Sequence, residues 1–258
     1  MGVPPVPKPP SSRKGPNRNL VIAIGAAVVV AAALIVGSIV LTGGGDKAAV
    51  GSTSTETTTT TAPTEGGTDP AVSLVAGIPQ NGTILGSSDT TVRMLQFEDL
   101  QCPSCKKYMD DVFAAVVEEY VRPGRARIDF RGLEFLGPDS EKALRIALAA
   151  GAQNKLWEVV GLFYEKQGDE NSGWVTDALI DEILASVPGL DSAKVKIDAK
   201  SARVTNQIAA TQAQATTLGV DGTPWFYFVV GVNRPLEFQP QSYTPEAFRP
   251  ALDDAIRG

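Results

Sequence analysis

Histidine is absent from this 258-residue chain, and cysteine occurs only twice, at Cys102 and Cys105. Without imidazole there is no histidine-activated nucleophile and no histidine-ligated metal site. Two cysteines are too few for a disulfide scaffold. They are also too few for a tetrahedral zinc site, which takes four nitrogen or sulfur ligands, so zinc would require carboxylates or a second copy of the chain. We therefore expect no metal.

Basic residues are scarce after the first nineteen positions. Residues 1–19 carry four Lys or Arg and no acid, which leaves 19 basic and 29 acidic residues in the remainder. A protein that binds nucleic acid usually carries a basic patch or stripe. The acidic remainder has no such footprint, so we expect no nucleic-acid partner.

Residues 20–41 form an apolar run without a charge or a proline. As a helix these residues span about 33 Å, which is enough to cross the hydrocarbon core of a bilayer. A cleaved signal peptide is the main alternative, but its apolar region is usually only about 7–15 residues long and ends at a small-residue cleavage site. We predict a retained transmembrane helix over 20–41.

The flanking charges predict the orientation of this helix. The four basic residues precede it, whereas Lys47 is the only Lys or Arg between residues 42 and 91. By the positive-inside rule, the proline-rich residues 1–19 form a disordered cytoplasmic tail and the rest of the chain lies outside the cytoplasm. The sequence thus predicts a single-pass protein of the cell membrane that contacts the lipid bilayer through 20–41.

Residues 42–78 are rich in Gly, Thr and Ser and include the threonine run Thr57–Thr61. Such a stretch buries too little apolar surface to offset the entropy of ordering, so we predict a flexible linker. It offers no segment suited to dimerisation, and we expect a monomer.

The pattern becomes globular from about residue 79. Strands are predicted at 91–97, 126–130, 225–230 and 235–238, and helices at 102–120, over most of 140–218 and from 244 onward. Ser140 is the candidate N-cap of the long helical block. This order of elements predicts one α/β or α+β domain over 79–258.

Cys102 and Cys105 form a C-x-x-C motif, which has more than one interpretation. A purely structural disulfide is one of them, but closing so short a loop removes little entropy from the unfolded chain. Redox chemistry is favoured.

The helix that follows the motif assigns different roles to its two sulfurs. Its apolar stripe, extended backwards, places Cys105 on the buried face. Cys102 falls at the N-cap, and Pro103 occupies the first helical position, where its missing N–H has no consequence. The backbone amides of Ser104 and Cys105 and the helix dipole stabilise a thiolate at the cap, where cysteine pKa values reach roughly 3.5–7.5. We expect Cys102 to be exposed and nucleophilic, and Cys105 to be sheltered and resolving.

The segment 97–106, Phe-Glu-Asp-Leu-Gln-Cys-Pro-Ser-Cys-Lys, resembles the active-site segment of DsbA-like thioredoxin-fold oxidoreductases. The segment 218–224, Leu-Gly-Val-Asp-Gly-Thr-Pro, resembles the cis-proline loop of the same family. The helical block between them is similar to the family's helical insertion, here about 139–200. The resemblance implies a thioredoxin fold with an inserted helical subdomain.

The resemblance also implies a role for each matching residue. Cys102 is the attacking or attacked sulfur, and Cys105 resolves the mixed disulfide. Pro224 is expected to be cis and to lie against the cysteine pair, while the Thr223 backbone pairs with an extended substrate segment. Pro103 and Ser104 support the pair from inside the motif.

Two positions depart from the family pattern. The family often has a buried acid six residues before the first cysteine, where this chain has Gln96. Glu98 lies on the same strand face and is either a substitute for that acid or a solvent-facing residue. Many members also have histidine at the position of Ser104, and its absence argues against a strongly oxidising potential.

Two apolar side chains beside the motif, Leu100 and Trp225, are expected to form a rim that grips unfolded chains, although Trp225 is nearly as well explained as core packing. Lys106 and Lys107 are expected to be solvated surface.

The function that the resemblance implies is thiol–disulfide exchange that introduces disulfide bonds into secreted or cell-surface polypeptides. The Cys102–Cys105 disulfide is then the only redox group, with no cofactor. The implied partners are folding polypeptides outside the cytoplasm and a quinone-linked membrane protein of the DsbB or vitamin K epoxide reductase type, which reoxidises the pair. Two alternatives stay open: a disulfide isomerase or reductase, and a binding module with idle cysteines.

Overall fold

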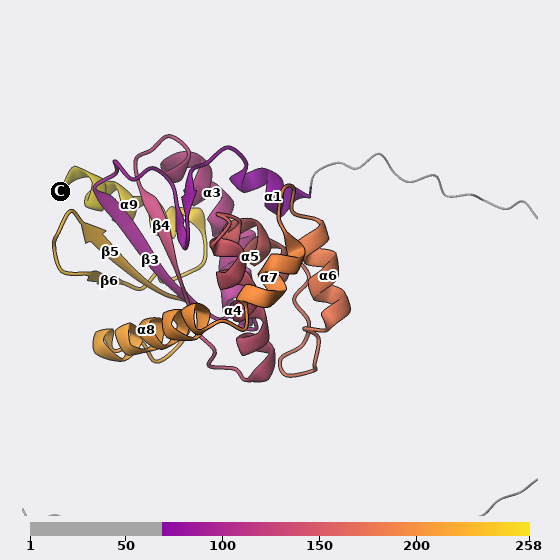
Figure 1. Cartoon of the computed structure of the whole chain (residues 1–258). Helices are drawn as coiled ribbons and strands as arrows, with labels where there is room; N and C mark the ends of the chain where they lie inside the picture. Colours follow the sequence, from indigo (N-terminus) through magenta and orange to yellow (C-terminus); the bar gives the residue numbers. More distant parts are fainter. Residues whose placement is uncertain (1–68) are drawn as a thin grey trace, which may run out of the picture. The chain divides into compact units, whose positions relative to one another are not determined.

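The computed structural model describes residues 69–258, which fold around a six-stranded sheet of order β1-β2-β4-β3-β5-β6 (Figure 1). The predicted tail, transmembrane helix and most of the linker lie outside the described residues. Within 69–258, none of the helices is long and apolar enough to cross a membrane.

The central strand of the sheet is β3, Val92–Glu98. It pairs in parallel with β4, Arg127–Gly132, and antiparallel with β5, Trp225–Val230. Successive side chains of a strand point to opposite faces. Met94 accordingly packs into one hydrophobic cluster, whereas Leu95 and Phe97 pack into a second one. With both faces covered, β3 is buried along almost its whole length, which explains its apolar composition.

The remaining strands extend the sheet at its two edges. A short hairpin that the sequence pattern did not predict, β1 at Gln80–Asn81 and β2 at Ile84–Leu85, pairs with β4. At the other edge, β6 at Leu236–Phe238 forms the predicted hairpin with β5.

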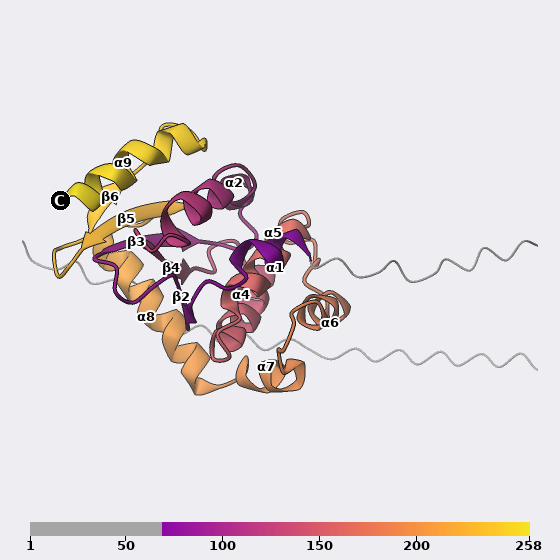
Figure 2. The same ribbon diagram turned by 90° about the horizontal axis from the view of Figure 1, so that it is seen from above.

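The helix predicted at 102–120 is present as a continuous helical segment from 103 to 121. It begins as α2, Pro103–Tyr108, and continues through η1, Met109–Phe113, α3, Ala114–Val116, and η2, Val117–Val121. The two π-helical turns, η1 and η2, were not predicted. The segment lies on the same face of the sheet as α9, Pro245–Arg257, and α8, Ala202–Leu218, covers the opposite face (Figure 2).

The predicted helical block contains four helices before α8. They are α4 at Pro138–Gly151, α5 at Leu156–Glu165, α6 at Asp177–Ala185 and α7 at Ser192–Asp198. They gather at one end of the sheet (Figure 1). The expected N-cap at Ser140 is wrong, because the N-cap of α4 is Gly137, three residues earlier. The helix begins at Pro138 and leaves Ser140 buried inside its first turn.

The domain begins earlier than the boundary expected at residue 79. Residues 70–75 form helix α1, with Asp69 as a side-chain N-cap and with Val72 and Val75 buried. The helix packs against α5, where Gly161 leaves room for Ala71: a Cβ at Gly161 would come within 2.9 Å of the Ala71 Cβ. The end of the predicted linker is therefore part of the folded domain.

Candidate active site

The cysteine pair lies where β3 ends and α2 begins. Cys102 is the N-cap residue of α2, with extended backbone angles of φ −71° and ψ 121°, and Pro103 follows at the first helical position. Cys105 is one turn into the helix and is 0% exposed. Both cysteines are free thiols, so the structure describes the dithiol form.

Cys102 is less exposed than expected. The residue is 8% exposed, and in its protonated form its thiol donates a hydrogen bond of 3.3 Å to the backbone carbonyl of Thr223. The prediction of an exposed sulfur was wrong because the loop before β5 covers it, whereas Pro103 and Ser104 beside it are exposed. A substrate sulfur therefore has to approach from the side of those two residues or displace the Thr223 contact.

The loop that covers Cys102 contains a cis peptide bond between Thr223 and Pro224, as expected. The loop starts where α8 ends at Gly219, whose positive φ of 78° makes it a left-handed helix cap. Pro224 is buried and Thr223 half-buried. The two sequence segments that carry the family resemblance thus meet at one sulfur.

The two thiols have opposite pKa shifts. The pKa of Cys102 is lowered to about 6, chiefly by a hydrogen bond from the Cys105 thiol, with contributions from the Thr223 side chain and the amides of Cys105 and Ser104. The pKa of Cys105 is raised well above its usual value, first by burial and then by the hydrogen bond that it donates to Cys102. At neutral pH the pair therefore holds one thiolate and one thiol, with the charge on Cys102.

Glu98 faces the cysteines from β3 and is fully buried. Its pKa is raised to about 8, mainly by burial, while a hydrogen bond from Tyr164 lowers it and the nearby charge of Cys102 raises it. The interpretation of Glu98 as a solvent-facing residue is therefore wrong. Its charge in turn raises the pKa of Cys105, so the ionisation of this carboxyl and that of the resolving sulfur are linked.

Gln96 is also buried and completes the surroundings of this carboxyl. Its side-chain amide donates to Oε1 of Glu98 at 2.6 Å, and the Tyr164 hydroxyl donates to Oε2 at 2.8 Å. The Tyr108 hydroxyl donates to Oε1 of Gln96 at 3.1 Å, which fixes the orientation of its amide. Gln96 thus acts as a hydrogen-bond donor to an acid two residues further along the strand.

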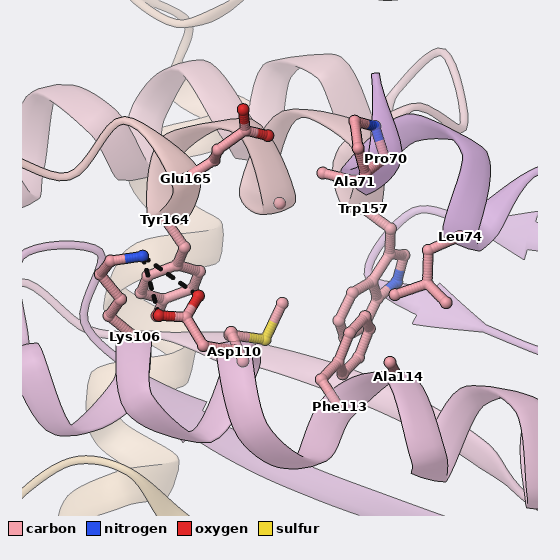
Figure 3. A pocket seen from close by; sticks show the side chains of 12 residues that line it. Pro70, Ala71, Leu74, Lys106, Asp110, Phe113, Ala114, Trp157, Tyr164 and Glu165 are labelled. Atoms are coloured by element: carbon pink, nitrogen blue, oxygen red, sulfur yellow. Dashed lines mark hydrogen bonds and ion pairs between the residues drawn. The ribbon is translucent and has the colours of Figure 1, made fainter. Parts of the chain in front are cut away.

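A cavity of about 470 Å³ lies beside this site, between α1, α5 and the helix that carries the cysteines (Figure 3). It is lined mainly by apolar side chains such as Leu74, Phe113 and Trp157, and Tyr164 forms part of its wall. Neither cysteine lines it. The cavity therefore borders the buried acid through Tyr164 but is not the place where sulfurs react.

Metal ligands are not gathered anywhere in the part of the chain that the structure describes: it contains no group of three or more His, Cys, Asp or Glu residues arranged to hold an ion.

Comparison with known families gives a match over most of the chain. The family described as Thioredoxin matches residues 79–254. The chain belongs to this family. The match includes both the cysteine motif and the cis-proline loop, so it covers the whole site.

Two relatives of this thioredoxin-family chain are disulfide bond formation proteins by name. The "Probable disulfide bond formation protein D" of Bacillus cereus is 27% identical over 146 residues, which cover 55% of this chain and 68% of the relative. The "Disulfide bond formation protein D" of Bacillus subtilis is 25% identical over 172 residues, or 64% of this chain and 74% of the relative.

Solved structures share the fold. Oxidised BdbD from Bacillus subtilis superimposes with a TM-score of 0.59 at 20% identity, over 70% of this chain and 98% of that one. Wolbachia pipientis alpha-DsbA1 gives a TM-score of 0.58 at 17% identity, over 72% and 96%. The thioredoxin fold with a helical insertion, expected from the resemblance, is confirmed for residues 69–258.

Two predicted substrate contacts have different outcomes. Leu100 is 1% exposed and belongs to the hydrophobic core, so its assignment to an exposed rim is wrong. Its side chain turns inward because the buried loop 99–102 packs under the helical insertion. Trp225 is half-buried and packs against the cluster that contains Leu95 and Phe97, and its indole Nε1 is buried.

The two lysines after the motif lie on the surface, as predicted. Lys106 pairs with Asp110 at 2.9 Å, and Lys107 pairs with Asp111. The partners of each pair are four residues apart on the surface of the helix. The carboxylate and the solvent therefore largely neutralise and screen the lysine charge.

Two residues near the pair gave no signal in the sequence. Tyr243, in the loop before α9, is half-buried, and its pKa is raised by burial and by the charges of Cys105 and Cys102. Tyr164 reaches Glu98 from α5. Both come from elements distant in sequence, and no local pattern connects them to the motif.

Proposed function

We propose that this domain is a thiol–disulfide oxidoreductase that introduces disulfide bonds into other proteins through Cys102 and Cys105. The observation that carries the proposal is the unequal pair: a sulfur with a pKa of about 6 at a helix N-terminus, hydrogen-bonded to a buried thiol of raised pKa. A stabilised thiolate in the dithiol form favours reduction of the enzyme and hence oxidation of the substrate. The names of the Bacillus relatives support the same direction.

The reaction starts from the Cys102–Cys105 disulfide. A substrate thiolate attacks the sulfur of Cys102, the S–S bond breaks, and Cys105 leaves as a thiolate that takes a proton. A second substrate thiolate then attacks the substrate sulfur of the mixed disulfide and displaces Cys102. The substrate ends as a disulfide, and the enzyme ends as a dithiol with its charge on Cys102.

Glu98 supplies and accepts the proton of Cys105 in this scheme. With a pKa near 8, its carboxyl group is largely protonated at neutral pH and can protonate the departing Cys105 thiolate. When the dithiol is reoxidised, the carboxylate form takes the proton back and frees Cys105 to attack. Glu98 thus takes the place of the buried acid that the family often has at the position of Gln96, and Gln96 donates a hydrogen bond to it.

The setting and the partners belong to the same proposal. The apolar run 20–41 and its flanking charges favour a catalytic domain held outside the cytoplasm on a membrane anchor. Its substrates are folding polypeptides whose extended segments pair with the Thr223 backbone. Turnover requires a membrane protein that accepts the electrons, and the family resemblance favours a quinone-linked one of the DsbB or vitamin K epoxide reductase type.

A trapping experiment tests the function. In the Cys105→Ala variant of the full chain, the Cys102 thiolate can attack a disulfide of another protein and release one of its thiolates, but no second cysteine resolves the mixed disulfide. The variant should therefore accumulate complexes with proteins that contain disulfides, which a reductant releases. The Cys102→Ala variant is the matched control and should accumulate none. Equal trapping by both variants, or none by either, contradicts the proposal.

The equilibrium potential of the pair separates oxidase from reductase. A value near that of thioredoxin, about −270 mV, belongs to a reductant, and one near −120 mV to a strong oxidant. We expect a value between the two, because Ser104 lacks the charge of a histidine. A value at or below that of thioredoxin would rule out net oxidation of substrates.

A further inference from the structure

The four residues that lead into the nucleophile, 99–102, are almost completely buried, although they form a loop. Buried backbone groups need hydrogen-bond partners. Most of the partners of this loop come from the helical insertion and the turn that enters it. The insertion is therefore in direct contact with the segment that sets the position of Cys102.

Asp99 forms the first part of this contact. Its Oδ1 accepts hydrogen bonds from the Ser140 hydroxyl at 2.6 Å and from the amide of Gln101 at 2.9 Å. Its Oδ2 accepts from the amide of Leu136 at 3.0 Å. Three donors on a buried carboxylate fix the loop relative to the start of α4.

Gln101 forms the second part. Its side-chain amide donates to the Ser140 hydroxyl at 2.9 Å, and its oxygen accepts from the amide of Asn171 at 2.7 Å. Gln101, which directly precedes Cys102, is thus bonded both to the start of α4 and to the loop after α5.

The third part reaches the nucleophile itself. Gln167 lies two residues beyond α5, and its Nε2 donates to the backbone carbonyls of Leu100 at 2.8 Å and Cys102 at 3.3 Å. The Cys102 carbonyl also accepts the hydrogen bond from the Lys106 amide, at 3.0 Å, at the start of α2. The side-chain amide of Gln167 is therefore hydrogen-bonded to the backbone of the residue that carries the nucleophilic sulfur.

We propose that Gln167 is a positioning residue for the thiol chemistry, through which the helical insertion fixes Cys102 over the amides at the start of α2. The inference rests on the proposed function. Hydrogen bonds to a thiolate depend steeply on direction, so rotation of the Cys102 peptide would weaken those from Ser104 and Cys105. The donor on Gln167 also offsets the partial negative charge of the Cys102 carbonyl, which belongs to the same residue as the thiolate.

The contact is separable from the stability of the insertion. Gln167 is half-buried, and both of its side-chain bonds go to the cysteine loop. The preceding helix is held in the core by Leu162, Phe163 and Tyr164. A side chain of similar volume without a hydrogen-bond donor should therefore leave the fold intact and change the pKa and redox equilibrium of Cys102.

Gln167→Met in the full chain is the test, with two readouts: the pKa of Cys102 from the ultraviolet absorbance of its thiolate, and the equilibrium constant with glutathione. We expect the pKa to rise by about half a unit and the pair to become about threefold less oxidising, since half a unit corresponds to a factor of about three. Gln167→Glu, which keeps the shape but replaces the donor by a charged acceptor, should shift both readouts further in the same direction.

Gln153→Met is the matched control. Gln153 is also in the insertion, and its side-chain amide also bonds to the backbone, at the carbonyl and the N–H of Asp191. Neither of these hydrogen bonds involves the cysteine loop. It should lose stability without moving the pKa of Cys102.

An unchanged pKa and equilibrium constant in folded Gln167→Met and Gln167→Glu would overturn the inference and leave Gln167 a structural residue. Failure of the proposed function is a different result, because there the wild-type chain itself would not exchange disulfides with glutathione. If Gln167→Met does not fold, Gln167→Glu alone decides, by the same two readouts.

Discussion

The Tyr164 hydroxyl donates a hydrogen bond of 2.8 Å to Oε2 of Glu98, joining the helical insertion to the central strand below the cysteines. Burial raises the pKa of Tyr164 well above its usual value, so this phenol keeps its proton over the working pH range. It therefore always donates, which stabilises the carboxylate form of Glu98, whereas burial stabilises the protonated form. The balance between the two effects places the titration of Glu98 near neutrality.

Tyr164→Phe should raise the pKa of Glu98 further, because the phenol is the group that lowers it. We expect a shift of about one unit, the usual size for the loss of one hydrogen bond to a charged group. Carbon-13 NMR of glutamate side chains measures it directly. Tyr108→Phe is the control, since Tyr108 donates to Gln96 and not to Glu98. Equal shifts in both variants would mean that general polarity, not this bond, sets the value.

Glu98→Gln should slow the steps in which Cys105 gains or loses a proton. We expect about a hundredfold loss in the single-turnover rate of dithiol oxidation, the lower end of what general acid–base groups contribute. The control is Glu158→Gln, which alters another buried glutamate, one that bonds to Gln80 and Lys155. A wild-type rate in the Glu98 variant would remove the carboxyl from the mechanism.

Glu98 should also make the stability of the domain depend on pH. Because its pKa is raised from 4.5 to about 8 on folding, the folded state binds the proton more tightly, and stability falls as pH rises through this window. The loss from this group between pH 4.5 and pH 7 is about 3 kcal/mol. Urea unfolding at a series of pH values measures it, and the slope should be shallower in Glu98→Gln. An identical slope in both proteins would contradict the assignment.

Alkylation of the dithiol form should follow the titration of Cys102. Only the thiolate reacts, so the rate should rise with pH around a midpoint near 6 and reach a plateau by about pH 8. Cys105 should stay unmodified throughout, because burial and its raised pKa keep it a thiol. Mass spectrometry after brief treatment with iodoacetamide distinguishes the two. A single midpoint near 9, or equal labelling of both cysteines, would show an ordinary, inactive pair.

The sequence was sufficient for the parts of the site that are local. The helical stripe placed Cys105 on the buried face, and the positions of Cys102 and Pro103 at the helix start follow from cap chemistry. These inferences use residues within one or two turns of each other, where spacing alone determines which side chains share a face.

The sequence was insufficient where the site is built across the chain. Nothing near Gln167 or Tyr164 marks them as neighbours of the cysteine loop, which lies more than sixty positions earlier. Ser140 looked like a helix cap because a cap is the usual local use of serine, but it bonds to Asp99. Leu100 looked like a surface contact because its burial depends on the insertion that packs over it. Such contacts are set by tertiary packing, which local spacing does not encode.

Helix α1 provides the last prediction, because the sequence assigned it to the flexible linker. A chain that begins at residue 79 lacks Val72 and Val75, both buried against the domain, and should lose about 3 kcal/mol of stability relative to one that begins at residue 69. It also lacks the carbonyls of Leu74 and Ala76, which accept hydrogen bonds from Arg122. Urea unfolding of the two chains measures the difference. Equal midpoints would mean that α1 adds no stability and belongs to the linker. The pKa of Cys102 should be the same in both, since the groups that lower it all lie after residue 79.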